Sequence, residues 1–419
     1  MTHKTSHRAR HTFVFSFLLS SLGTLALQGN PALAADLPAF SAEDVFEMEY
    51  ANDPQVSPDG ARVAYVRSAM DIMTDRTRRS IWVVDVDGDN HRPLVSGSGT
   101  FSSPRWSPSG DRLAYLSNTE GKTQLFVKWL DGGETAKVTT LPESPRSIVW
   151  SPDGKHIAFT RFVPSPPPKL ADMPAKPKGA KWAEPATVVD RMTFRFDGGG
   201  YLPTGNQQVF VVPADGGTPR QMTSGDYPIS GSVSWMPDSQ SIIFSSNRRE
   251  DVEYHPRQND LYAASLVTGE LTQMTDHAGP ESDPAVSPNG RYLAYTSAAD
   301  TRQGYNRSDL RIMDLTSGES RSLTADLDRS VSDIQWSANS KSVWIRYNDL
   351  GMARIAEVDL KGNLKQADIV LGGTALGRPY TSGAFSVGGK DRIAYTLGRD
   401  DRPADLALMR SGKRSLQLT

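Results

Sequence analysis

The side-chain types that serve as nucleophile and base in hydrolases are present in this sequence, but they are not spaced as a catalytic site. A serine nucleophile on a strand-to-helix elbow has the pattern G-x-S-x-G, which is absent from the 419 residues. The segment Gly231-Ser232-Val233-Ser234 comes closest, but it leads into a β-strand pattern. The histidines beyond the N-terminal region are scattered: His91, His156, His255 and His277. Since nucleophile and base must lie within hydrogen-bond reach, we predict no catalytic residue in this sequence.

Metal chemistry is not favoured either. Cysteine is absent, which excludes disulfides, thiolate metal sites and cysteine nucleophiles. The sequence has neither H-E-x-x-H nor clustered histidines, so a zinc site is not predicted. Residues 85–90 resemble the start of a calcium loop, but the glycine is misplaced and Ser96 stands where a bidentate glutamate is needed. We interpret that segment as a hairpin turn and predict no metal and no cofactor.

A repeated sequence pattern predicts the fold in which these side chains are positioned. Each copy has a short apolar strand, a turn of the type Ser-Pro-Asp-Gly and a second apolar strand, followed by two further short strands. The first residues of the turns are Ser57, Ser107, Ser151, Met236, Ser287, Ser337 and Ser386. Seven such units predict an all-β fold, a seven-bladed β-propeller of WD40-like (TolB-type) repeats with four strands per blade, over residues 54–419.

Residue types within the repeat have clear roles. Proline and aspartate favour the central turn positions, and glycine tolerates the positive φ that closes the turn. Four tryptophans precede turns, and we interpret them as packing residues between blades rather than as a platform for ligands. They are Trp106, Trp150, Trp235 and Trp336. Blade one opens with its first strand and the last blade ends with its fourth, so we expect side-chain packing, and no shared sheet, to close the ring.

An insertion at 162–206 interrupts blade three between its second and third strands. Loops of this length are usually functional or disordered. The first half is rich in proline and lysine, which favours disorder. The second half mixes aromatic residues with arginine and aspartate. Two interpretations of this half remain: it is a binding segment, or it is a plain surface loop.

Strand direction predicts which face this insertion joins. Because strands alternate in direction, loops between second and third strands lie opposite the Ser-Pro-Asp-Gly turns, on the face that holds both ends of the ring. Carboxylates there are expected to hold a peptide's amino terminus, and arginines a carboxylate or carbonyl, since charge-assisted hydrogen bonds are strong. The substrate-facing candidates are Arg191, Arg195, Asp197, Tyr201, Arg248, Glu250, Glu253 and Tyr254.

The N-terminal region has the order of a secretory signal peptide. Basic residues precede an apolar run from Phe13 to Leu27, and Ala32-Leu33-Ala34 forms a cleavage site. The run is short for a membrane span, so we expect residues 1–34 to be removed and the chain to be periplasmic, with no membrane attachment. The formal charge of −2 gives no sign of a nucleic-acid partner. In the segment 35–53, Ser41 and Asp44 form a capping pattern that predicts a short helix.

The blades resemble the WD40-like repeats of TolB and of prolyl oligopeptidase-family peptidases. Seven blades (TolB has six), the opening residues 40–45 and 53–60, and an insertion ending in Arg-Phe-Asp-Gly-Gly-Gly-Tyr at 195–201 are similar to the acylaminoacyl peptidase and dipeptidyl peptidase branch. The resemblance covers residues 40–419. In that family an α/β-hydrolase domain with the catalytic serine, aspartate and histidine follows the propeller, and none of those residues can be carried over here.

The resemblance implies the substrate-gating and binding propeller of an exported serine peptidase acting on oligopeptides, with peptides as partners. The catalytic domain is missing from the 419 residues, as in a truncated gene product or fragment. Activity would need an α/β-hydrolase domain in cis or in trans, and we predict that these residues alone are inactive. The alternative is a stand-alone periplasmic TolB-like protein-interaction propeller, although the α/β domain that precedes the TolB propeller has no counterpart here. A lectin-like or enzymatic propeller should show repeated polar pockets or clustered acids, and neither is present.

Overall fold

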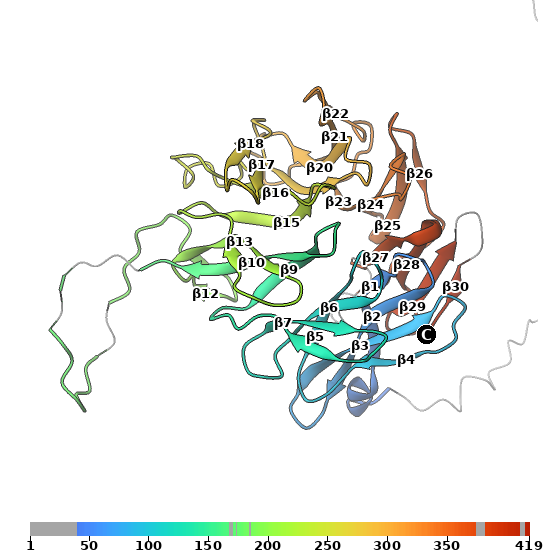
Figure 1. The fold of residues 1–419 in the computed structure, drawn as a ribbon, viewed down its shortest axis with the longest axis horizontal. Helices are drawn as coiled ribbons and strands as arrows, with labels where there is room; N and C mark the ends of the chain where they lie inside the picture. Colours follow the sequence, from blue (N-terminus) through green and yellow to red (C-terminus); the bar gives the residue numbers. More distant parts are fainter. Residues whose placement is uncertain (1–39, 167–170, 173, 184–185, 374–381, 411–414) are drawn as a thin grey trace, which may run out of the picture. The chain divides into compact units, whose positions relative to one another are not determined.

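The computed structural model describes residues 40–166, 171–172, 174–183, 186–373, 382–410 and 415–419. The predicted signal peptide and its cleavage site lie outside these residues. Within the unit Val45–Thr419, seven four-stranded antiparallel sheets are arranged as the blades of a propeller (Figure 1). The predicted fold class is therefore confirmed. No helix in the described ranges is long and apolar enough to cross a membrane.

Each blade takes its four strands in chain order. Blade one is β1 (Glu49–Val56), β2 (Arg62–Asp71), β3 (Arg76–Asp85) and β4 (Arg92–Val95); blade two is β5 (Phe101–Trp106), β6 (Arg112–Ser117), β7 (Gln124–Trp129) and β8 (Thr135–Lys137). Blade three is β9 (Pro145–Trp150), β10 (His156–Pro164), β13 (Gly205–Pro213) and β14 (Arg220–Gln221), with a hairpin of β11 (Arg195–Phe196) and β12 (Gly200–Tyr201) inside its insertion. Blade four is β15 (Ile229–Trp235), β16 (Ser241–Ser246), β17 (Asp260–Ser265) and β18 (Leu271–Gln273); blade five is β19 (Glu281–Val286), β20 (Tyr292–Ala298), β21 (Ser308–Asp314) and β22 (Ser320–Ser322). Blade six is β23 (Val331–Trp336), β24 (Ser342–Asp349), β25 (Met352–Asp359) and β26 (Leu364–Gln366); blade seven is β27 (Phe385–Gly388), β28 (Arg392–Leu397), β29 (Asp405–Arg410) and β30 (Leu416–Gln417).

In five blades a serine opens the turn and fixes the hairpin between the first two strands. Met236 takes this place in blade four, and in blade seven it is Gly388 rather than the predicted Ser386, which lies within β27. In blade one the buried Ser57 hydroxyl donates to the Asp59 carboxylate at 2.6 Å and accepts the backbone N–H of Arg62 at 2.9 Å. Ser151 makes the same pair of bonds with Asp153 and His156. Because one hydroxyl satisfies a donor and an acceptor at the same turn, the motif prefers serine to an apolar residue of similar size.

A hydrogen bond between neighbouring blades recurs from junction to junction, and it is of one of two types. Where a blade's first strand ends in tryptophan, its indole N–H donates to a backbone carbonyl of the preceding blade, as from Trp106 to Gln55 at 2.9 Å and from Trp336 to Ala285 at 2.8 Å. Where the residue at the corresponding register position is valine, its backbone N–H donates to a side chain of the preceding blade instead. The valine bonds are Val286 to Ser234 at 3.0 Å, Val387 to Gln335 at 2.8 Å and Val56 to Ser386 at 2.8 Å. The predicted packing role of the tryptophans is thereby confirmed.

Blades one and seven close the ring without exchanging a strand. Each is a complete four-stranded sheet, and the Val56–Ser386 bond is the same kind of contact that joins the other blades. A buried apolar cluster spans the junction: Ala51, Val56, Val63, Tyr65, Val84, Val86, Ala394, Leu406, Leu408 and Leu418. Side-chain burial therefore supplies the closure that a shared sheet would otherwise provide.

The segment before the ring differs from the expectation. The predicted helix is a single 3₁₀ turn, Glu43–Glu47, in front of which the Ser41 N–H donates to the Asp44 carboxylate at 2.6 Å. Glu49 lies outside the helix and opens β1, which begins five residues before the expected start of the propeller at 54. The strand is longer because Tyr50 and Ala51 are buried, and burial of these side chains outweighs the local helix pattern.

Candidate functional site

The insertion leaves blade three at the end opposite its Ser-Pro-Asp-Gly turn. In the β10–β13 pair, Pro164 lies opposite Gly205 at the insertion, and His156 lies opposite Pro213 at the other end, next to the turn. The connection between β16 and β17 of blade four also leaves its blade at the end opposite the turn between the first two strands. The strand directions used in the prediction are therefore those of the structure, and the two candidate loops emerge at equivalent blade ends.

Three segments meet in a small cleft at this end of blades three and four. Arg191 of the insertion places Nη2 2.9 Å from both carboxylate oxygens of Asp226, and the Asn206 side-chain amide donates to the same carboxylate at 2.6 Å. The backbone N–H of Met192 donates to Glu253 of the blade-four loop at 2.8 Å. These bonds attach the insertion to blade four. The cleft has a volume of about 160 Å³ and is lined by Arg191, Thr193, Asn206, Asp226, Pro228, Val252, Glu253 and Pro256.

The charge balance of this cleft favours a cationic ligand. Two carboxylates, Asp226 and Glu253, face one guanidinium, Arg191, which is already paired with Asp226. Glu253 accepts only the Met192 N–H among the described residues, so its remaining acceptor capacity is available. A carboxylate with free acceptor sites beside a neutralised ion pair suits an ammonium group, since charge-assisted hydrogen bonds are stronger than neutral ones.

Arg248 packs against aromatic rings. Its guanidinium stacks on Tyr227, 4.4 Å from the ring centroid, and lies 5.7 Å from the ring of Tyr262. Its Nη1 is buried and has no partner within the described part of the chain. The side chain therefore packs between aromatic rings by a cation–π contact, which fixes the start of the blade-four loop, and retains one unused donor.

A second cleft lies on the other side of the same loop. It has a volume of about 590 Å³ and is formed by residues 254–258 of blade four and residues 300–306 of blade five. Tyr254, which is largely exposed, lines it together with Arg257 and Arg302. In the described ranges neither arginine forms an ion pair, whereas Asp300 accepts a bond from Gln258 at 2.9 Å. This cleft thus offers two guanidinium groups to an anion.

Several predicted residues are not brought to either cleft. Arg195 and Tyr201 pair across the exposed hairpin β11–β12, and Asp197 lies in its turn. The ring of Tyr201 packs on Phe194, with ring centroids 6.1 Å apart. Glu250 is exposed and has no hydrogen bond or ion pair within the described part of the chain. The sequence pattern at 191–201 therefore contains two residues that line the cleft, Arg191 and Thr193, and an exposed hairpin.

Asp226, Arg257 and Arg302 were missed by the sequence reasoning. Asp226 lies in the connection from the fourth strand of blade three to the first strand of blade four. Such connections share a face with the loops between second and third strands, so the same strand-direction argument would have found it. Arg302 lies in the equivalent loop of blade five. Over the residues with described coordinates, no group of His, Asp or Glu side chains is arranged to hold a metal ion.

Comparison with known proteins connects this region to peptidases. A family model described as the TolB beta propeller domain matches residues 60–163, and one described as the dipeptidyl peptidase IV (DPP IV) N-terminal region matches residues 181–301. Dipeptidyl-peptidase 5 of Porphyromonas gingivalis is 24% identical over 371 residues, which cover 84% of this chain and 53% of that protein. The chain is therefore similar to the propellers of dipeptidyl peptidases. The resemblance noted in the sequence is confirmed, and all three charged residues of the smaller cleft lie inside the 181–301 match.

Solved structures share the fold of this propeller. The Pyrococcus horikoshii acylaminoacyl peptidase superposes with a TM-score of 0.66 at 17% identity, covering 89% of this chain and 53% of that one. The β-propeller domain of the Trilobed protease from Pyrococcus furiosus, described as having an open velcro topology, gives a TM-score of 0.61 at 17% identity, covering 89% and 96%. The chain spans about half the length of the dipeptidyl peptidase and of the acylaminoacyl peptidase that it matches.

Proposed function

We propose that this chain is the substrate-binding and substrate-gating propeller of an exported serine peptidase that acts on oligopeptides. The observation that carries the proposal is the smaller cleft, where Arg191, Asp226 and Glu253 from three separate segments converge at the blade end that also holds Glu49 and Thr419. A hydrolase domain joined to the propeller at that end, in cis or in trans, would face these side chains. Export and periplasmic location are part of the proposal and follow from residues 1–34.

The two clefts suggest how a peptide is oriented. Residues 252–258 of the blade-four loop form a ridge, with Glu253 on the side of the smaller cleft and Arg257 on the side of the larger one. A free amino terminus fits the carboxylate side, and a carboxylate or carbonyl fits the arginine side. Short peptides with both termini free are therefore the preferred substrates, and a long folded chain cannot present both groups at one ridge.

Peptide binding to the 419-residue chain tests this directly. Calorimetric titration with tetra-alanine, N-acetyl-tetra-alanine and tetra-alanine amide separates the contributions of the two termini. We expect acetylation to weaken binding about tenfold, and Glu253→Gln to weaken binding of the free peptide by a similar factor and of the acetylated peptide hardly at all. Glu270→Gln, an exposed substitution in the turn between β17 and β18, is the matched control.

Catalysis is tested by joining the chain to a family α/β-hydrolase domain and measuring kcat/KM for the same peptides. Equal kcat/KM for free and acetylated peptides in the wild type, together with no effect of Glu253→Gln, would remove the cleft from substrate binding. Binding of a folded protein in place of every peptide would favour the TolB-like interaction role instead.

A further inference from the structure

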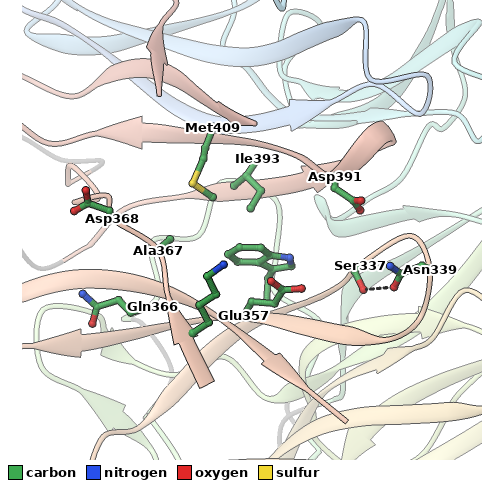
Figure 2. A pocket seen from close by; sticks show the side chains of 11 residues that line it. Ser337, Asn339, Glu357, Gln366, Ala367, Asp368, Asp391, Ile393 and Met409 are labelled. Carbon is green, nitrogen blue, oxygen red and sulfur yellow. Dashed lines mark hydrogen bonds between the residues drawn. The ribbon is translucent and has the colours of Figure 1, made fainter. Parts of the chain in front are cut away.

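A cleft between blades six and seven lies outside the peptide-binding region. It has a volume of about 320 Å³, which is at the lower end of the range for small-molecule sites. Figure 2 shows Ile393 and Met409 on one side, Glu357 and Gln366 on the other, and Asp391 and Asp368 toward its two ends.

The cleft lies at a junction that lacks the packing pair used at four others. There, the first residue of the second strand stacks against the tryptophan of the next blade, as Arg112 does on Trp150 at 4.9 Å and Tyr292 on Trp336 with rings 6.4 Å apart. Between blades six and seven the corresponding residues are Ser342 and Val387, as they are Ser241 and Val286 between blades four and five. Both side chains are too small to form such a stack. Blades six and seven are joined instead by a buried apolar cluster, against which Trp344, Val387 and Met409 pack.

A tryptophan from one wall takes part of the space in this cleft. The third position of the second strand is alanine in five blades: Ala64, Ala114, Ala158, Ala294 and Ala394. Blade four has Ile243 there and blade six has Trp344. In the described part of the chain the Trp344 indole N–H has no hydrogen-bond partner, unlike those of the tryptophans that join blades. The ring is thus a lining residue of the cleft with an unused donor.

Each wall of the cleft is a row of residues that are register partners on neighbouring strands of one blade. On blade six the row is Trp344, Glu357 and Lys365, and on blade seven it is Ile393 and Met409. Glu357 accepts a bond from Ser342 at 2.5 Å. Within the described ranges no ion pair joins it to Lys365, which lies next to it across the strands. An aromatic and apolar interior is therefore combined with a carboxylate that is not neutralised.

The polar groups around this interior are mainly acidic. Glu357, Asp368 and Asp391 contribute three carboxylates against the single ammonium of Lys365. A cation gains from both features, since it is attracted by the carboxylates and by the face of an indole ring. An anion of the same shape would be repelled.

We propose that the cleft between blades six and seven binds a small organic cation, an ammonium or guanidinium group carried on an apolar body. The apolar body packs on Trp344, Ile393 and Met409. The cationic group lies at Glu357 and Asp391. The site is independent of the proposed peptide-binding clefts, because it is formed by different blades.

Methyl NMR of the full chain with ¹³C-labelled methionine tests the proposal, with the Met409 resonance assigned through Met409→Leu. Phenethylamine is the probe, and 3-phenylpropionate, of similar shape with the opposite charge, is the comparison. We expect saturable shifts of the Met409 methyl with a dissociation constant of roughly a millimolar for the amine, and no shift with the carboxylate. The blocked peptide acetyl-Leu-Lys-Leu-amide distinguishes the sources: competition indicates a lysine side chain of a polypeptide, and its absence indicates a free amine.

Charge-removing variants locate the cation. Glu357→Gln and Asp391→Asn should each weaken phenethylamine binding about three- to tenfold, whereas Glu319→Gln, in an exposed turn of blade five, should leave binding unchanged. Thermal unfolding of each variant identifies any effect on the fold, and Asp391→Asn remains informative if loss of the Ser342–Glu357 bond destabilises the blade. The proposal is overturned if phenethylamine causes no Met409 shift at 20 mM, if phenylpropionate binds equally well, or if both variants bind like the wild type.

Discussion

The closure of the ring can be tested at a single hydroxyl group. Ser386 Oγ is the acceptor for the Val56 backbone N–H across the junction of blades seven and one, at 2.8 Å, and both residues are buried. Ser386→Ala removes that acceptor and adds no bulk. The N–H is then left without a partner in an apolar cluster, which costs about 1–3 kcal/mol of unfolding free energy.

The expected change is measurable in two ways. For a propeller of this size, 1–3 kcal/mol corresponds to a decrease in Tm of roughly 1–4 °C. Loss of a local bond of that strength should also accelerate hydrogen exchange of the Val56 amide about 5- to 150-fold. Mass spectrometry of peptides covering β1 measures this exchange. Ser234→Ala is the matched control, because it removes the equivalent bond to Val286 at an internal junction.

The test depends on comparing the effects of the two variants. If side-chain burial and this bond close the ring, Ser386→Ala and Ser234→Ala should have effects of the same size, each confined to its own junction. Unchanged exchange of β1 in Ser386→Ala would refute the reasoning. So would destabilisation below about 0.3 kcal/mol, because a buried N–H without a partner costs more than that.

Further predictions concern a close contact and a buried acid. Gly60→Ala should destabilise the propeller by more than about 3 kcal/mol, and Gly110→Ala by only about 1 kcal/mol. Both glycines have positive φ, but a Cβ at Gly60 would lie 2.3 Å from the carbonyl oxygen of Gly389, whereas nothing lies within 3.6 Å at Gly110; equal losses in urea unfolding would contradict this. Burial, together with the charge of Glu281, raises the pKa of Asp260 to about 6. Because the raised pKa favours the protonated acid in the folded state, stability should fall as pH rises from about 4 through 6, by at most about 3 kcal/mol. Asp260→Asn should abolish this part of the pH dependence of Tm, and an unchanged profile would exclude Asp260 as its origin.

The sequence by itself determined the architecture, because its signals are local and repeated. Each Ser-Pro-Asp-Gly turn defines a hairpin through bonds within about six residues, as Ser57 shows with Asp59 and Arg62. The order of strands then follows from the chain, and so does the face on which each loop emerges. This is why the strand directions at the insertion agreed with the prediction, and why Arg191 and Glu253 were recognised as candidates.

Only the tertiary structure decided which charged residues meet. Arg191 pairs with Asp226, 35 positions along the chain, because both lie where two blades adjoin, whereas Arg195 and Asp197 lie on an exposed hairpin. The cleft between blades six and seven has the same origin. Trp344 is an ordinary strand residue in the sequence, and it lines a cleft only because Ile393 and Met409 of blade seven lie on the other side of the junction. Local patterns specify turns and strands, whereas a binding site depends on the combined volumes and charges of side chains from separate segments, and these are set by packing between blades.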